Sequence, residues 1–134
     1  MARVGIIAEF NPLHSGHEFL INEAKKSGEV VCAVSGNFVQ RGDCAIASKE
    51  IRARSALISG ADLVCEIPVL WSMSTAQNFA LGGVSALAAL GCDTLVFGSE
   101  AGDTKSLIEI CDILESDKFS DLLGKYMKNG TTFA

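Results

Sequence analysis

Four runs of consecutive apolar residues, separated by stretches of helical character, most constrain what this chain can fold into. The runs are VGIIAEF (4–10), EVVCAVS (29–35), DLVCEIP (62–68) and DTLVFGS (93–99). Their apolar residues follow one another instead of alternating with polar ones, which is typical of parallel strands covered on both faces. We therefore expect four strands in the interior of an α/β fold.

Helices are expected between and after these runs, because apolar spacing, capping residues and glycine stops recur there. The expected helices cover 15–26, 49–58 with Ser48 as N-cap, 74–90, 104–114 and 117–128. The resulting βαβαβαβα order, joined by right-handed crossovers, predicts a doubly wound, Rossmann-like parallel sheet. Within 74–90, the pair Gly82-Gly83 indicates either a helix break or a close helix contact.

Length and composition fit one domain over residues 1–134. The chain has 134 residues, of which 49% are hydrophobic and 20% charged, as in ordinary soluble globular proteins. No apolar run approaches the roughly 20 residues of a membrane-spanning helix, so we expect a cytoplasmic protein without a membrane partner. The formal net charge of −5 argues against strong nucleic-acid binding by this piece alone, because such binding depends on neutralising phosphates.

Cysteine usage predicts neither a disulfide framework nor a metal site. The five cysteines include no C-x-x-C pair, and their number is odd. Cys32 and Cys65 lie in apolar runs and are expected to be buried, whereas Cys44 lies in a polar loop and is expected to be exposed.

The two histidines of the chain both lie in NPLHSGH, directly after the first apolar run. In doubly wound sheets, ligands bind beyond the carboxyl ends of the strands, where the strand order reverses. A helix that begins here offers free N–H groups and a positive dipole end to phosphate. His14 and His17, three residues apart, can present both rings on one side. The pattern predicts a polyphosphate site; polar residues at a helix cap, or a zinc site completed by Glu9, are the alternatives.

Several segments resemble one known family. HSGH resembles the H-x-G-H signature of the nucleotidyltransferases related to class I aminoacyl-tRNA synthetases. GIIAEFNPLHSGH, SGNFVQRGD, ASKEIRARSAL, GADLVCEIPV and VFGSE follow in this order. Together they are similar to the tRNA(Met) cytidine acetate ligase family, and the resemblance runs from Arg3 to about Asp103. SGNFVQRG is the most specific of these segments.

The resemblance implies a reaction in two steps: ATP activates acetate as acetyl-adenylate, and the acetyl group passes to N4 of the wobble cytidine of elongator tRNA(Met). It implies that His14 and His17 are catalytic groups on the ATP phosphates, with Mg²⁺ held by phosphates and water. The implied ATP-binding residues are Ile7, Ala8, Glu9, Phe10, Asn11, Pro12, Leu13, His14, Ser15, Gly16, His17, Glu18, Phe19, Leu20 and Gly98.

The loop after the second run supplies further candidates on the ligand side of the sheet. We expect Asn37, Gln40, Arg41 and Lys49 to contact substrate. Arg41 can hold phosphate or carboxylate through its forked guanidinium, and Lys49 and Arg52 add charge at the start of the next helix. Arg54 is expected to lie on a solvated face. Glu66 pairs with one of these cations or accepts hydrogen bonds from a loop.

The chain also departs from the family in length, since its members run much further. On this ground we expect a truncated nucleotide-binding part that lacks the last strand and the tRNA-binding region, with weak or absent tRNA(Met) binding. Cys44 and Glu50 stand where the family pattern has proline and tryptophan. Two other functions remain open: a different adenylyl- or cytidylyltransferase with a small phosphorylated substrate, and a non-catalytic nucleotide-binding module.

Overall fold

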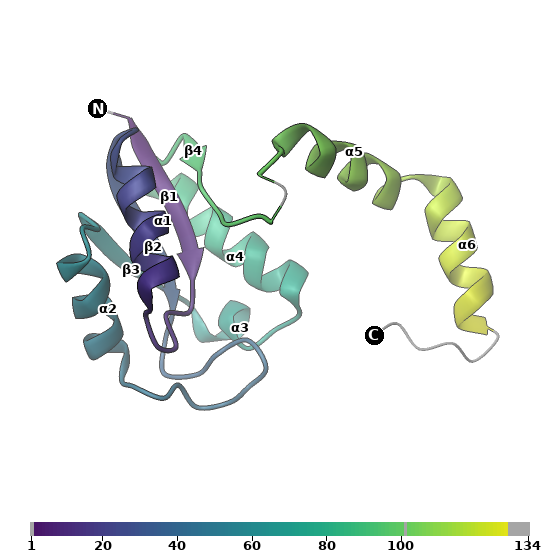
Figure 1. The fold of residues 1–134 in the computed structure, drawn as a ribbon. Helices are drawn as coiled ribbons and strands as arrows, with labels where there is room; N and C mark the ends of the chain where they lie inside the picture. The colour runs from purple at the N-terminus through teal and green to yellow at the C-terminus, as the bar shows by residue number, and fades with distance from the viewer. Residues whose placement is uncertain (1, 101, 129–134) are drawn as a thin grey trace. The chain divides into compact units, whose positions relative to one another are not determined.

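A four-stranded parallel sheet with helices on both faces forms the first of two compact units in the computed structural model (Figure 1). The structure describes residues 2–100 and 102–128. The units are Met1–Phe97 and Gly98–Ala134. The strands are β1 (Arg3–Ala8), β2 (Glu29–Ser35), β3 (Leu63–Ile67) and β4 (Thr94–Leu95). Their order is β3-β2-β1-β4, so the predicted doubly wound sheet is confirmed and its order reverses beside β1.

The observed strands match the bounds of the predicted runs to different degrees. β1 pairs with β2 from Arg3↔Glu29 to Ala8↔Val34, and β2 has the predicted bounds. β4 is much shorter than the predicted run 93–99. Only Thr94 and Leu95 pair with β1, followed by one more hydrogen bond of 2.9 Å from Val96 N to the Gly5 carbonyl. Among the described residues, β4 has only one neighbouring strand, β1. An apolar sequence does not lengthen a strand without backbone partners to pair with, so the rest of the run 93–99 lies outside the strand.

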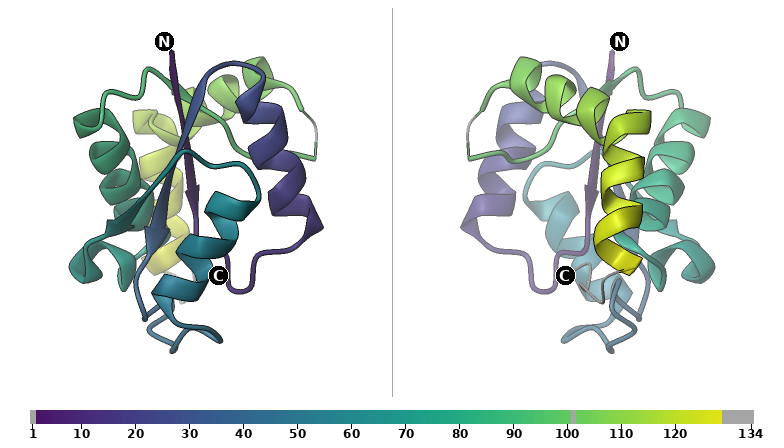
Figure 2. Two further views of the ribbon diagram at one scale, coloured as in Figure 1. Left: turned by 90° about the vertical axis from the view of Figure 1, so that its left-hand side faces the viewer. Right: turned by 90° about the vertical axis from the view of Figure 1, so that its right-hand side faces the viewer.

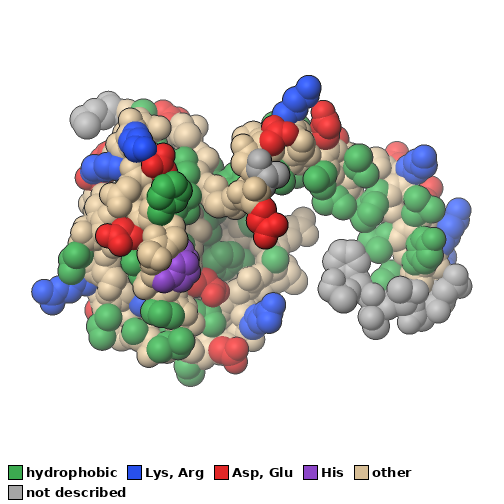
Figure 3. Space-filling view, in the orientation of Figure 1, with side chains coloured by type: hydrophobic (Ala, Val, Ile, Leu, Met, Phe, Trp, Pro, Cys, Tyr) green, Lys and Arg blue, Asp and Glu red, His purple; other side chains and the backbone are tan. Residues whose placement is uncertain are grey.

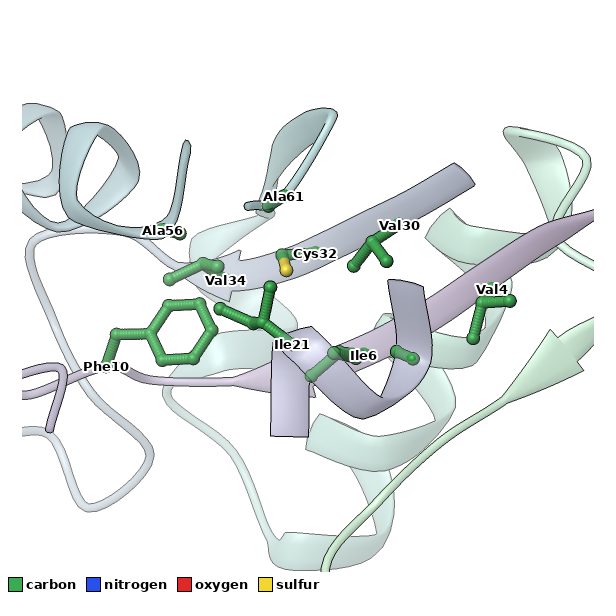
Figure 4. Packing of buried hydrophobic residues seen from close by; sticks show 10 residues of the cluster. Val4, Ile6, Phe10, Ile21, Val30, Cys32, Val34, Ala56 and Ala61 are labelled. Atoms are coloured by element: carbon green, nitrogen blue, oxygen red, sulfur yellow. The ribbon is translucent and has the colours of Figure 1, made fainter. Parts of the chain in front are cut away.

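Helices α1 (Ser15–Lys25) and α2 (Lys49–Ile58) cover one face of the sheet, and α4 (Ala76–Ala89) covers the other (Figure 2). The side chains of β2 alternate between these faces, as pleating requires. Val30, Cys32 and Val34 pack toward α1 and α2 (Figure 4). Val31 and Ala33 pack on the α4 side. Both faces are therefore buried, which is why the strand has no polar alternation.

Close packing explains the glycine pair of α4. The helix runs through Gly82 and Gly83 without a break. A Cβ at Gly82 would lie 2.5 Å from Cβ of Trp71, and a Cβ at Gly83 would lie 2.8 Å from Cδ1 of Ile7. Of the two interpretations left open by the sequence, the close contact is therefore correct.

A short helix, α3 (Val69–Ser72), follows β3 and was not expected from the sequence. Its four residues are too few to show helical periodicity. It begins after Pro68, and its last residue, Ser72, is buried and donates a hydrogen bond of 2.7 Å to the Phe38 carbonyl. This contact ties α3 to the loop that follows β2.

The second unit contains the two helices predicted there, α5 (Thr104–Leu114) and α6 (Asp117–Lys128). Asp103 caps α5, because its carboxylate accepts hydrogen bonds of 3.0 Å from Lys105 N and 3.2 Å from Ser106 N. Across the described residues, every helix is too short or too polar to cross a membrane.

Candidate functional site

The loop from Glu9 to His14 joins β1 to α1, at the edge of the sheet where the strand order reverses. It borders a pocket of about 340 Å³ lined by Glu9, Phe10, Asn11, Pro12, His14 and His17. The structure thus brings six of the predicted ATP-binding residues together in one hollow. The histidine side chains lie together on the surface of the first unit (Figure 3).

The two imidazoles cap α1 in a reciprocal arrangement. Gly16 N donates to Nδ1 of His14 at 3.2 Å, and His14 N donates to Nδ1 of His17 at 3.3 Å. The rings stack with centroids 3.8 Å apart. A neutral imidazole that accepts at Nδ1 carries its proton on Nε2. Each ring therefore keeps one N–H donor for a ligand in the pocket.

The environment of His17 favours its neutral form. Partial burial lowers its pKa below the ordinary value of 6.5, and the neighbouring His14 lowers it further. Protonation at Nδ1 would also remove an acceptor that caps the helix. A polyphosphate would act in the opposite direction, because negative charge stabilises the imidazolium. His17 can thus donate a hydrogen bond when neutral and gain charge when an anion binds.

Phe10 anchors this loop. Its side chain is 1% exposed and lies beside Ile21 and Val34 in the core (Figure 4). Its φ of +48° is rare for a residue with a side chain. The ring meets His17 edge-on, with centroids 5.1 Å apart. Phe10 therefore holds the turn and packs against the His17 ring.

The zinc alternative is not supported by this geometry. Metal binding through Nε2 would place a proton on Nδ1, yet Nδ1 of both rings already accepts a backbone hydrogen bond. The carboxylate of Glu9 accepts 2.7 Å from Gln40 N. Among the described residues, no group of three or more metal-ligating side chains was found.

The structure does not gather the predicted substrate residues around this pocket. Gln40 adjoins it through its N–H bond to Glu9, whereas Lys49 and Asn37 each line another hollow. Asn37 and Lys49 also have structural partners. Asn37 Oδ1 accepts 3.0 Å from Lys49 N and so caps α2, while the side chain of Ser48 makes no cap bond. Lys49 Nζ lies 2.7 Å from Glu66, and this carboxylate raises the pKa of Lys49. Glu66 is therefore the ion-pair partner of Lys49. These contacts do not test whether the loop binds substrate, so that role remains a prediction.

The arginines of this region differ sharply in exposure. Arg41 and Arg54 are exposed, the latter as predicted. Arg52 was expected to add charge at the start of α2, and this was wrong. Its side chain is buried and donates to backbone carbonyls. The signal that could have shown this is helical spacing, because Arg52 and the buried Ala56 lie four residues apart on one face.

Gly98, the remaining predicted ATP-binding residue, is the first residue of the second unit. It lies three positions beyond the end of β4. Its contact with a nucleotide remains a prediction.

Comparison with known proteins decides the family. The sequence model of the HIGH nucleotidyl transferases matches residues 1–134. The chain belongs to this family. The family is named for a motif of the H-x-G-H type. In this chain the motif is HSGH, at residues 14–17.

Several relatives of this HIGH nucleotidyl transferase chain are curated under the same name. The tRNA(Met) cytidine acetate ligase of Caldanaerobacter subterraneus subsp. tengcongensis is 46% identical over 100% of the chain and 35% of its own length. The Lactobacillus acidophilus protein of the same name is 56% identical over 75% of the chain and 27% of its length. The chain thus spans about a third of the length of such relatives.

Solved structures agree with this assignment. Thermotoga maritima TmcAL bound with alpha-thio ATP is 37% identical, with a TM-score of 0.88 over 99% of the chain and 34% of that protein. Its apo form gives a TM-score of 0.90 at 36% identity, over 99% of the chain and 33% of that protein. The parallel sheet and its helices therefore recur in an experimentally determined HIGH nucleotidyl transferase relative.

Proposed function

We propose that the chain is the ATP-binding part of an enzyme that activates acetate and transfers the acetyl group to N4 of the wobble cytidine of elongator tRNA(Met). The observation that carries the proposal is the 46% identity, over the whole chain, to a curated tRNA(Met) cytidine acetate ligase. The pocket at the two histidines supplies a site of suitable chemistry. Relatives that act on tRNA favour a cytoplasmic location.

In the first step, an acetate oxygen attacks the α-phosphorus of ATP, and the bond to the β-phosphate breaks. Acetyl-adenylate forms and pyrophosphate leaves. In the second step, the cytidine N4 amine attacks the acetyl carbonyl, loses a proton and displaces AMP. The protein contributes positioning and charge stabilisation, so it needs no nucleophile of its own.

His14 and His17 would donate their Nε2–H groups to the β- and γ-phosphates, where negative charge grows as pyrophosphate leaves. The N-terminus of α1 adds a favourable dipole at the same place. Mg²⁺ would arrive with ATP, bound mainly by phosphates and water. The segment from Ile7 to Leu20 would enclose the nucleotide.

The loop after β2 would face the second substrate. Arg41 is exposed, so its fork is free to take a carboxylate or phosphate oxygen pair. Asn37, Gln40 and Lys49 lie on the same loop or directly after it, at the ligand side of the sheet. With a net charge of −5, the chain offers little general electrostatic attraction for tRNA. We infer that the additional residues of the longer relatives supply the tRNA-binding surface.

Isothermal titration calorimetry with ATP tests the nucleotide site. We expect His14→Ala and His17→Ala each to weaken binding about ten- to a hundredfold, because each loses one charge-assisted hydrogen bond worth about 1.5–3 kcal/mol. Asn22→Ala, an exposed substitution on the same helix, should bind ATP like the wild type. Unchanged affinity in both histidine variants would mean that the nucleotide binds elsewhere.

Acetate-dependent release of pyrophosphate tests the reaction. Acetate should stimulate the release from ATP, whereas small phosphorylated acceptors should not. Stimulation by a phosphorylated acceptor, or by CTP in place of ATP, would assign the site to a different nucleotidyltransferase reaction. Binding of ATP with no turnover would indicate a nucleotide-binding module.

A further inference from the structure

Arg52 is a buried cation at a place where two loops of the candidate site meet. Its side chain lies in α2 and the residue is 1% exposed. It is not among the residues that line the histidine pocket. A cation so far removed from water is costly unless its N–H groups find partners, so its partners indicate what it does.

Three backbone carbonyls from two loops converge on this guanidinium. It donates 2.5 Å to the Glu9 carbonyl after β1 and 3.1 Å to the Ala47 carbonyl before α2. It also donates to the Gly36 carbonyl after β2, and lies 3.5 Å from the Ser35 hydroxyl. One side chain thus joins the start of the histidine loop to both ends of the segment 36–47.

We propose that Arg52 is a positioning residue that fixes the histidine loop against the segment 36–47, and so presets the pocket for the triphosphate. Two further hydrogen bonds tie the same segments together. Gln40 N donates 2.7 Å to Glu9 Oε1, and Ile46 N donates 2.7 Å to Asn11 Oδ1. Glu9 and Asn11 both line the pocket. A displacement of the segment 36–47 would therefore also displace two residues of the pocket lining.

An arginine suits this place and a lysine does not. The guanidinium has five N–H donors in a planar fork, so one group can reach carbonyls in three directions. An ammonium has three donors at a single point. Burial lowers the pKa of Arg52, while the charges of Glu9, Glu66 and Glu50 act in the opposite sense. The side chain remains charged, because arginine is protonated at any physiological pH.

The expected effect of an Arg52 substitution on ATP affinity rests on the proposed ATP site. Arg52→Lys keeps the charge but loses the fork, and Arg54→Lys on the same helix is the matched exposed control. Measured by calorimetry below the unfolding transition, Arg52→Lys should bind ATP about tenfold more weakly, because a loosened site must be ordered on binding. Arg54→Lys should bind like the wild type.

Two NMR readouts separate positioning from general stability and need no ATP. The ring protons of His14 and His17, which are the only histidines, should shift in Arg52→Lys. The amides of Gln40 and Ile46 should exchange faster with solvent, while those of β2 keep their wild-type rates. If the ring signals and both amide rates are unchanged in the folded variant, the proposal is overturned.

The wild-type protein provides a test that does not depend on a variant that folds. The Nε–H of Arg52 donates to the Ala47 carbonyl, and Arg52 is 1% exposed, so this N–H should exchange with solvent at least about tenfold more slowly than that of the exposed Arg54. Equal rates would refute the inference. Absence of ATP binding by the wild type would contradict the proposed function, while the NMR tests would still decide the role of Arg52.

Discussion

Replacement of Gly83 by alanine tests the packing that brings α4 against β1. In an exposed helix, glycine to alanine stabilises by about 1 kcal/mol. Here the new Cβ would meet Ile7 at 2.8 Å from Cδ1 and 2.9 Å from both Cγ1 and Cγ2. Ile7 is β-branched and therefore stiff, so the three contacts cannot all be relieved by one rotation.

Overpacking of this kind costs about 1–3 kcal/mol. Since the propensity gain of about 1 kcal/mol offsets part of it, we expect Gly83→Ala to lower the free energy of unfolding by up to roughly 2 kcal/mol. Urea denaturation followed by fluorescence measures this. The single tryptophan, Trp71, lies directly against Gly82 and reports on the same region.

Two controls separate packing from helix propensity. Ser85→Ala changes an exposed position of the same helix and should stabilise slightly, by a few tenths of a kcal/mol. Ile7→Ala removes the clashing atoms, so Gly83→Ala should cost less in that background than in the wild type. If Gly83→Ala stabilises the protein as Ser85→Ala does, α4 does not approach β1 as closely as described.

Two other predictions concern titratable groups. The pKa of His17 is lowered below 6.5, so the unfolded chain binds more protons, and the free energy of unfolding should fall as the pH drops from about 6.5 through the lowered pKa. Urea titrations from pH 8 to 5 measure this, and an unaltered slope in His17→Asn would contradict it. Burial raises the pKa of Cys32 to about 12, so its thiol should resist alkylation at pH 8 while the exposed Cys44 reacts. Peptide mass spectrometry shows the order, and labelling of Cys32 in the folded protein would refute its burial.

Local signals sufficed for the architecture. The apolar runs predicted the bounds of β2, and Ser48 lies at the N-cap position of α2, as predicted, although its side chain makes no cap bond. The HSGH segment lies at the reversal of strand order, as its position directly after the first apolar run predicts. These features follow from neighbouring residues alone, since periodicity, turn residues and capping act over a few positions.

Site details that depend on distant partners were not predictable in this way. Asn37 and Glu66 are polar residues near the ligand side, and only the fold shows that both serve α2, one as a cap and one as the partner of Lys49. Similarly, no local pattern predicted α3 or the short length of β4. A helix of four residues shows no periodicity, and the length of a strand depends on the strand beside it.

The sequence by itself determined where the two histidines lie and what class of fold carries them. The tertiary structure decided that Arg52 is buried and Arg54 exposed, although both occupy the same helix. The physical reason is that a charged side chain takes its role from the groups that surround it. For Arg52 these are carbonyls of Glu9, Gly36 and Ala47, which the fold brings together from the loop after β1 and from both ends of the loop after β2.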